Sequence, residues 1–447
     1  MTKTTPIGNE YLERYPEWRE SLPGNHLAWL AKMRADAFQR FAESGFPTPK
    51  TEAWKYTNLN PLAKNVFSPK AEFSETTGAA DLPPEAQNWP SSHRLVFING
   101  KHIAPGPTAA TLPKGVRLLS LGEALKTAPD LIADLLMNNE KPETPGLHNI
   151  NTALMTEGAV LLIEPGVQLE KPVHFFFLAT EAAGEAAMHL RNLVVLGKGS
   201  TATVLESYLG TGQAGYWTNA VTEIAVHNDA RLHHYKFQNE SPAAYHIAAT
   251  AAKIGDHALY DNFIMSLGGS LSRNDLFALL DGSGIDCRLN GVNLARNRQH
   301  MDTTSVIDHK KLGSSSNETY KNVVDDHAQT VFQGKVVVRP DSQKTSAHQL
   351  NRNLLLSDNA SANAKPELRI HADDVQCSHG ATTGELDEQA LFYFRSRGIA
   401  EDIARSLLTE SFLAELVDAV EIPAIREKMR QEITSWLAQA WPIGGHP

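Results

Sequence analysis

The sequence predicts a mainly β protein, with a parallel β-helix as its core and helical segments before and after it. Two observations predict this fold class. From about residue 151 to residue 385 the chain consists of short β-rich runs broken by Gly, Asn, Asp and Pro, and helical periodicity returns only toward the ends. Within the β-rich part a turn signature recurs, as expected for stacked coils.

The turn signature is an acidic or amide residue closely followed by Ala. It occurs at Asp229, Asp256, Asp326 and Asn359, at spacings of 27, 70 and 33 residues, and the Asp281-Gly282 turn divides the long spacing. Strands that recur in this way predict coils that each bury their inward face on the next coil. An antiparallel sandwich is the structural alternative, because periodicity does not give strand direction.

Residues 1–92 are expected to form a helical domain and a linker. Apolar residues between Leu27 and Phe41 fall at helical spacing, which predicts an amphipathic helix over residues 24–45. In the following segment, TEAWKYTNL, Trp54 and Tyr56 are expected to act as packing anchors. Four prolines among acidic and small residues from Ser68 to Ser92 indicate the linker.

The β-helix is expected over residues 93–386, with its main coils from about residue 151. At its start, Asn99-Gly100 lies between two apolar runs. Both residues tolerate the positive φ of a tight turn, so this dipeptide predicts a hairpin.

Residues 387–447 are expected to form a C-terminal helical domain. Leu408, Phe412, Leu416 and Val420 fall four residues apart, which predicts a helix with a wide apolar face. Pro423 suits the first turn of a following helix, because proline lacks the N–H that this turn leaves unpaired.

Composition narrows the class of partner. The chain carries 41 basic and 51 acidic residues, a net charge of −10, which argues against nucleic acid as the main partner. The sequence contains no apolar run long enough to span a membrane, and its start lacks the pattern of a secretory signal. We therefore expect a cytoplasmic protein without a membrane partner.

Cysteine is scarce, and this limits metal chemistry. Cys287 and Cys377 are the only two cysteines and lie far apart in the sequence. An iron–sulfur cluster normally takes four protein ligands, usually thiolates. This chain could therefore hold a cluster only by mixing ligand types or by sharing the site with another subunit.

The densest group of reactive side chains is the segment HADDVQCSHGATTGELD, residues 371–387. Thiolate and imidazole are natural ligands of iron and zinc, and in a strand Cys377 and His379 would point to the same face. The alternative is a buried structural cysteine beside a turn histidine. Asp373 and Asp374 are adjacent, so strand alternation separates them and favours turn-forming roles. The histidines elsewhere in the chain need no special function.

Several enzyme classes lack support in the sequence. There is no Walker spacing around Gly197-Lys198, no G-x-S-x-G elbow and no H-E-x-x-H helix. The enzyme alternative that stays open is a β-helix carbohydrate-active enzyme, a lyase or esterase, which would place carboxylates and basic residues along one exposed sheet.

The segment from Lys365 to Ala400 resembles the signature of the SufB/SufD family of iron–sulfur cluster assembly scaffolds. The segments TEAWKYTNL, 151–172 and 331–357 extend the resemblance over nearly the whole chain. It implies a right-handed parallel β-helix flanked by helical domains, and a non-catalytic scaffold subunit of the SUF assembly system.

Two features favour the SufD branch of the family: the aromatic N-terminal segment, and Phe394, which stands where SufB-type scaffolds place a cysteine. The resemblance implies pairing with a SufB-type scaffold through the late strands, and self-association as a homodimer. It further implies docking of a SufC-type ATPase on the C-terminal helices. The docking candidates on these helices are Ile403, Leu407, Leu408, Phe412 and Leu416.

The resemblance also implies roles for two residues of the reactive segment. His379 is the first candidate for a cluster-interface residue and Cys377 the second, either of them as a ligand of iron or of a cluster shared transiently with SufB. No stably bound cofactor is expected.

Overall fold

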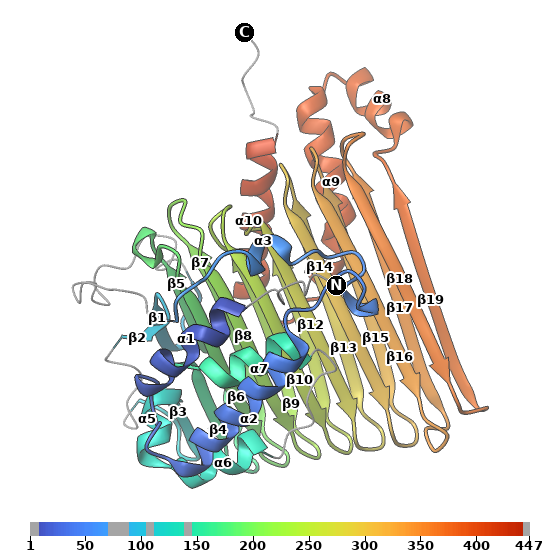
Figure 1. Cartoon of the computed structure of the whole chain (residues 1–447). Helices are drawn as coiled ribbons and strands as arrows, with labels where there is room; N and C mark the ends of the chain where they lie inside the picture. Colours follow the sequence, from blue (N-terminus) through green and yellow to red (C-terminus); the bar gives the residue numbers. More distant parts are fainter. Residues whose placement is uncertain (1–8, 70–88, 104–110, 138–144, 441–447) are drawn as a thin grey trace.

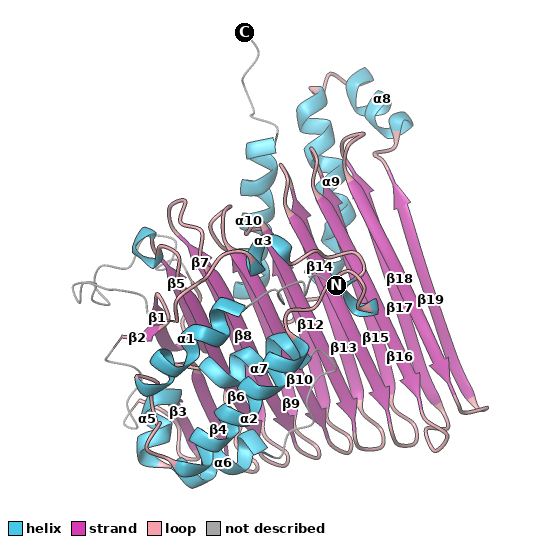
Figure 2. Cartoon of the chain, in the orientation of Figure 1, coloured by secondary structure: helices cyan, strands magenta, loops and turns pink. Residues whose placement is uncertain are grey.

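The computed structural model describes residues 9–69, 89–103, 111–137 and 145–440 (Figure 1). It shows a parallel β-solenoid of about eight turns with helices before and after it in sequence (Figure 2), which confirms the predicted fold class. Most of the predicted linker, residues 70–88, lies outside the described residues.

Two sheets face each other, and each coil contributes one strand to each sheet. Sheet I consists of β2 (Lys101–His102), β1 (His93–Ile98), β5 (Val173–Ala179), β7 (Thr201–Gly210), β9 (Arg231–Asn239), β11 (Leu259–Ser266), β13 (Asp286–Ala295), β15 (Ser315–Val324), β17 (Thr345–Leu355) and β19 (Val375–Gly384). Sheet II consists of β3 (Val116–Ser120), β4 (Ala159–Ile163), β6 (Ala187–Leu196), β8 (Trp217–Val226), β10 (Tyr245–Ile254), β12 (Leu271–Leu280), β14 (His300–His309), β16 (Gln329–Val338) and β18 (Ser361–Ile370).

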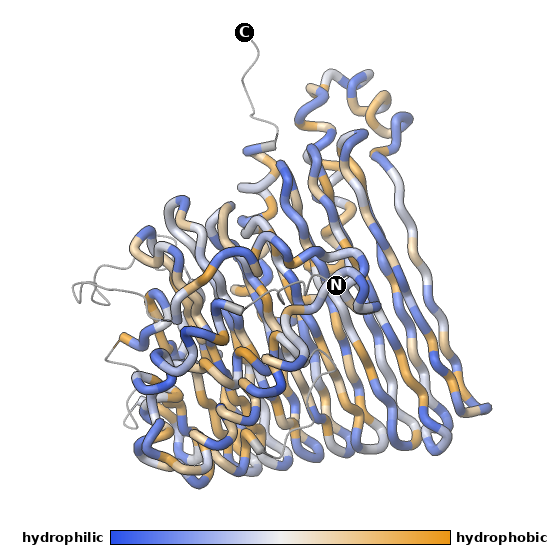
Figure 3. The backbone as a smooth tube through the Cα atoms, viewed as in Figure 1, coloured by the Kyte–Doolittle hydropathy of each residue, from blue (hydrophilic) through white to orange (hydrophobic). Residues whose placement is uncertain are grey.

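Successive coils pair in parallel and in register. Ile254, for example, lies between Val226 of the preceding coil and Leu280 of the next. This pairing excludes the antiparallel sandwich. Strand side chains alternate between the two faces, so each coil stacks its apolar side chains on those of its neighbours between the sheets. Figure 3 shows hydrophobic and hydrophilic residues interspersed along the strands.

The tight turns from sheet II to sheet I carry one left-handed residue in most coils, which lets the chain reverse within four to six residues. These residues are Gly199, Asp229, His257, Gly284, Gly313 and Lys344.

The turn signature predicted from the sequence combined two kinds of turn that lie at opposite ends of the coils. Asp229 and Asp256 lie in turns from sheet II to sheet I, whereas Asp326 and Asn359 lie in turns from sheet I to sheet II. Because turns of two kinds were counted as one series, the spacing between Asp256 and Asp326 came out as an uneven 70 residues.

The N-terminal helices cover the outer face of sheet II (Figure 1). They are α1 (Asn9–Glu20), α2 (Ala28–Ser44), α3 (Asn60–Ala63) and α7 (Pro145–Leu154). The predicted helix over 24–45 is confirmed as α2, and its end is marked by Gly45 at φ 64°, whose N–H donates to the Phe41 carbonyl at 2.7 Å.

The TEAWKYTNL segment lies across the outer face of sheet II. Trp54 is completely buried, and the Arg273 guanidinium lies 3.8 Å from its ring centroid. Farther along, the Thr57 hydroxyl lies 2.9 Å from His300 Nε2. The prediction that Trp54 is a packing anchor is confirmed, whereas Tyr56 is half-buried.

The first end of the solenoid is closed by short strands and helices. The predicted hairpin is confirmed, since Asn99 (φ 50°) and Gly100 (φ 79°) join the antiparallel strands β1 and β2. At the other edge, β3 pairs antiparallel with β4 and leads into α5 (Leu121–Thr127) and α6 (Pro129–Met137). Apolar residues of these two helices pack against Val160 and Leu193 of sheet II.

The C-terminal helices are α8 (Glu388–Ser396), α9 (Glu401–Asp418) and α10 (Pro423–Ala440). Helices α9 and α10 pack on the outer face of sheet I, with Leu413 and Val417 among the buried contacts. This confirms the predicted apolar helix face, and Pro423 is the first residue of α10. Within the described ranges, no helix is long and apolar enough to cross a membrane.

Candidate functional site: the open end of the solenoid

The last coil, formed by β18 and β19, is the least covered part of the solenoid (Figure 1). These strands end their sheets, so each has one outer edge that pairs with no other strand of the described chain. Every residue of β11 is buried, whereas no residue of β18 or β19 is. This coil therefore presents the edges of both sheets and the end of the interior to the outside.

Cys377 lies in β19 and faces the interior of the solenoid. It is half-buried, packs against the main core and pairs in register with the buried Ala347. Burial raises the pKa of the Cys377 thiol, and a backbone hydrogen bond with Ala347 opposes this only in part. In the isolated chain the thiol is therefore protonated at neutral pH, and a bound metal would have to displace its proton.

His379 lies two residues farther along β19, on the same face as Cys377, and its side chain is exposed. Its register partner in β17 is Gln349, which is only 3% exposed. Gln349 Nε2 donates to Glu318 Oε2 at 2.8 Å. The imidazole therefore ends a column of polar side chains that begins inside the solenoid.

Glu318 and Gln349 of this column were not predicted from the sequence, and Glu318 is the charged one. It is fully buried, and burial raises its pKa to about 7. Its alternation with Ser316 and Tyr320 along β15 was the available signal, because these three positions share the inward face. The signal was weak, since a lone Glu in a strand is more often solvent-facing.

His371, Asp373 and Asp374 of the segment lie in the turn before β19. Asp373 and Asp374 are exposed, and the N–H of Asp374 donates to Gln343 Oε1 at 2.9 Å. The predicted turn role of this pair is consistent with these contacts. The structure thus brings Cys377 and His379 together on one face, and leaves the two aspartates outside it.

The five docking candidates on the C-terminal helices divide by exposure. Ile403 and Leu407 are 36% and 43% exposed, whereas Leu408 and Phe412 are half-buried. Leu416 is only 7% exposed because it packs between α9 and sheet I, so it is withdrawn from the docking surface. Its place at helical spacing in the sequence did not reveal which side of the helix the sheet covers.

Two residues of α8 extend the exposed apolar surface beyond the predicted set. Phe392 is 72% exposed and Tyr393 is 57% exposed. Phe394 beside them is half-buried. We call Phe392, Tyr393, Ile403 and Leu407 the α8–α9 surface. Large exposed apolar side chains on two neighbouring helices are typical of interaction sites.

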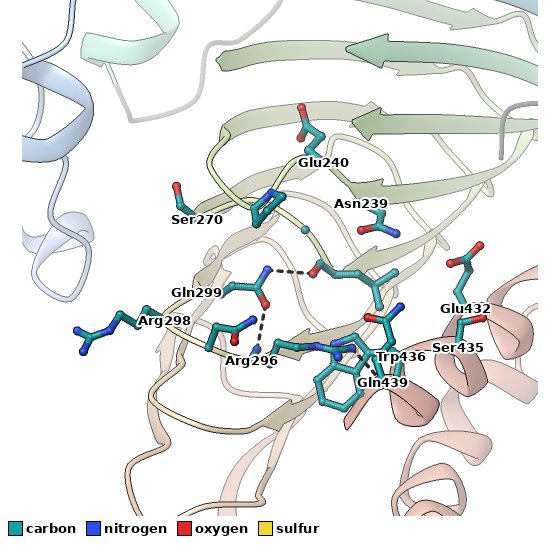
Figure 4. Close-up of a pocket in the computed structure, with 14 residues that line it drawn as sticks. Asn239, Glu240, Ser270, Arg296, Arg298, Gln299, Glu432, Ser435, Trp436 and Gln439 are labelled. Atoms are coloured by element: carbon teal, nitrogen blue, oxygen red, sulfur yellow. Dashed lines mark hydrogen bonds between the residues drawn. The ribbon is translucent and has the colours of Figure 1, made fainter. Parts of the chain in front are cut away.

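A cavity of about 430 Å³ lies between α10 and the turns that lead from sheet I to sheet II (Figure 4). The Arg296 guanidinium stacks on the Trp436 ring, with 4.3 Å to its centroid, and donates to the Trp436 carbonyl at 2.9 Å. Gln299 Oε1 accepts a hydrogen bond from the backbone N–H of Arg296 at 2.9 Å. These polar groups hold α10 to the solenoid, which indicates a structural role for the cavity wall.

The enzyme alternative required an exposed sheet lined with charged groups. Over much of their outer faces the two sheets are instead covered, sheet II by the N-terminal helices and TEAWKYTNL, sheet I by α9 and α10. Largely covered sheet faces, an unpaired last coil in the described residues and an exposed helical surface are typical of proteins that assemble with other proteins.

Comparisons with known proteins agree with this class. The family model described as "SUF system FeS cluster assembly, SufBD core domain" matches residues 177–412, and the one described as "SufBD protein N-terminal region" matches residues 5–175. The chain belongs to the SufBD family of the SUF iron–sulfur cluster assembly system.

Two relatives align over most of their length. An iron–sulfur cluster assembly SufBD family protein of Synechocystis is 33% identical over 91% of each chain. The iron–sulfur cluster assembly protein SufD of Escherichia coli is 29% identical over 91% of this chain and 92% of its own. The chain is therefore similar to SufD over nearly its entire length, and family membership supports a role in iron–sulfur cluster assembly.

Proposed function

We propose that the chain is a SufD-type, non-catalytic scaffold subunit that works in the cytoplasm as part of a SUF complex. The observation that carries the proposal is the open last coil, where Cys377 and His379 share one face of β19, whose outer edge pairs with no other described strand. The chain belongs to a family of iron–sulfur cluster assembly proteins, and this supports a role for the two residues in binding iron or a cluster.

A SufB-type scaffold is the proposed partner at the open end. Strands β18 and β19 each present an edge of 10 residues, and a second solenoid could continue both sheets by main-chain hydrogen bonds. The same end could pair with itself about a two-fold axis, which gives the homodimer. The two assemblies then compete for one surface.

The nascent cluster is the cargo of this interface. Cys377 and His379 offer one thiol and one imidazole, so the partner has to supply the other ligands. The donor types suit iron, and the neutral thiol releases its proton only when metal arrives. His379 is the more accessible of the two, which makes it the first ligand or positioning group we expect to act.

A SufC-type ATPase is the proposed partner of the α8–α9 surface. Ile403 and Leu407 keep their docking role, and Phe392 and Tyr393 join them. Nucleotide binding by such a partner would shift the two scaffolds relative to each other if its contacts with them differ between two states.

The experiment co-expresses the chain with SufB-type and SufC-type partners, purifies the complex and reconstitutes it with iron and sulfide without oxygen. We expect His379→Ala to lose cluster absorbance while the complex stays intact. His371→Ala is the matched control, because His371 is also exposed but lies in the turn before β19. Normal cluster formation in the His379 variant would contradict the proposed role.

A further inference from the structure

A second group of ligand-type side chains lies far along sheet I from the open end. It joins His233 of β9, Asp261 of β11 and Glu421, which lies in the connection between α9 and α10. One donor atom from each residue lies within 4.8 Å of the other two. No special role was predicted for His233, and sequence spacing does not reveal the group, since the two partners lie 28 and 188 residues away.

The strand register explains why His233 and Asp261 meet. They are direct partners on the outward face of adjacent strands, and His233 Nδ1 lies 3.0 Å from Asp261 Oδ2. A carboxylate that accepts the Nδ1 proton fixes the tautomer and turns Nε2 outward as a ligand, as in many carboxylate–histidine–metal sites. The Tyr235 hydroxyl, 3.5 Å from the same Asp261 oxygen, helps to hold that carboxylate in place.

The free imidazole nitrogen faces the helical connection. His233 Nε2 lies 3.6 Å from Glu421 Oε2, which is longer than a normal hydrogen bond. Two ligands at about 2.1 Å from one tetrahedral metal ion lie roughly 3.4 Å apart. The observed separation therefore suits two ligands of one ion better than a direct hydrogen bond.

Burial and charge also suit a cation. His233 is 8% exposed and Asp261 is 6% exposed, whereas Glu421 is exposed and leaves access from solvent. Arg288 lies 3.5 Å from Glu421 and 2.7 Å from Asp286. The three carboxylates and one guanidinium of this group leave two negative charges, which a divalent ion would balance.

We propose that His233 and Glu421, oriented by Asp261, bind one divalent first-row transition-metal ion of the Zn²⁺ or Fe²⁺ type. Imidazole and carboxylate ligands favour this class of ion. The ion fastens the α9–α10 connection to sheet I, and so steadies the helical pair whose first helix carries part of the α8–α9 surface. The proposal does not depend on the assembly role of the open end.

The test uses the untagged full-length chain and Co²⁺ as the probe. We expect one Co²⁺ per chain, visible d–d bands without a sulfur-to-cobalt charge-transfer band, and a higher melting temperature. His233→Gln and Glu421→Gln should each weaken binding at least ~10-fold, and Asp261→Asn about 10-fold through loss of orientation. Circular dichroism checks that each variant is folded.

Two matched variants separate this site from others. Glu415→Gln removes an exposed carboxylate of α9 that pairs with Lys321 and does not belong to the His233 group. Cys377→Ser removes the thiol of the open end. Both should bind Co²⁺ as the wild type does.

Three results would overturn the proposal: no stoichiometric Co²⁺ binding by the wild type, unchanged binding in Glu421→Gln, or a thiolate spectrum that Cys377→Ser abolishes. Glu421 is exposed, so Glu421→Gln should fold even if the His233 variant does not. Cluster reconstitution with partners does not enter this test, and its failure would leave the metal site standing.

Discussion

The two ends of the solenoid differ in how far their outermost strands are protected from pairing with further strands. At the first end the outermost strands are β2 and β3, of two and five residues, both antiparallel to their neighbours and followed or covered by other elements. At the last end the outermost strands are β18 and β19, of 10 residues each and parallel to their neighbours, and no other strand of the described residues pairs with their outer edges. Short antiparallel edges resist further pairing, and long parallel edges invite it.

This difference supports the proposal that the last coil pairs with a partner. Repeat proteins need caps because a terminal coil exposes one side of its core. At the first end, strands and helices of this chain form the cap. At the last end, the partly exposed apolar residues that a cap would cover are Val375, Cys377 and Leu368, which pack against the core. We infer that another protein provides the second cap.

The largest expected effect comes from the same truncation at both ends. Leu161→Ala in β4 removes a completely buried side chain and should lower the free energy of unfolding by about 3 kcal/mol or more. Leu368→Ala in β18 removes a half-buried one and should cost about 1 kcal/mol in the isolated chain. Urea unfolding followed by circular dichroism measures both, and equal losses would break the comparison.

The next largest expected effect is a loss of affinity between the open end and a SufB-type partner. Ala381 is exposed, but it continues an inward column through the buried Asn351, so a solenoid stacked on the open end would bury it. Ala381→Asp should leave the chain folded and weaken pairing with a SufB-type partner by ~3 kcal/mol, about 100-fold, because the carboxylate would be unpaired.

Thr382→Asp is the control for this substitution, since Thr382 points to the outer face of the same strand beside Arg352. It should change the affinity by less than ~1 kcal/mol. Analytical ultracentrifugation of the mixed scaffolds measures both variants. Equal weakening by the two aspartates would mean that charge in general, and not position in the column, opposes assembly.

The pH dependence of stability should differ between the wild type and Glu318→Gln. The folded-state pKa of Glu318, about 7, lies above its unfolded value, so the folded chain holds the proton more tightly. Its contribution is full below the unfolded pKa and is lost as pH rises through 7, by about 2 kcal/mol. Thermal unfolding at pH 5 and pH 8 should show a smaller loss for the variant, and parallel curves would contradict the assignment.

The smallest effect concerns the two thiols. Cys287 is completely buried and burial raises its pKa strongly, whereas Cys377 is half-buried at the open end with a smaller rise. Iodoacetamide should label Cys377 slowly and leave Cys287 unmodified in the folded chain. Mass spectrometry after brief exposure gives the ratio, and addition of the SufB-type partner should protect Cys377.

The sequence predicted those turns and helix ends that a few adjacent residues determine. The left-handed dipeptide Asn99-Gly100, the helix that ends at Gly45 and the proline that begins α10 were all predictable, because each is specified by a few adjacent residues. The coil repeat was detected but placed in one series, because turns at opposite ends of a coil use the same residue types.

Long-range placement could not be predicted from the sequence. Leu416 falls on the helix face that sheet I covers, which helical spacing alone does not identify. Glu318 and Gln349 become a column only through strand register, and His233 meets Glu421 only because α9 and α10 fold back on sheet I. Strand alternation did place Cys377 and His379 on one face, since period 2 is a local property.

The most direct test of the account is hydrogen exchange of the backbone amides, measured by mass spectrometry, in the free chain and in its complex with a SufB-type scaffold. We predict rapid exchange of residues 361–370 and 375–384 in the free chain and marked protection of both strands in the complex, with strands β3 and β4 unchanged. Protection confined to other regions, with β18 and β19 still exchanging freely in the complex, would contradict the claim that the open end is the assembly surface.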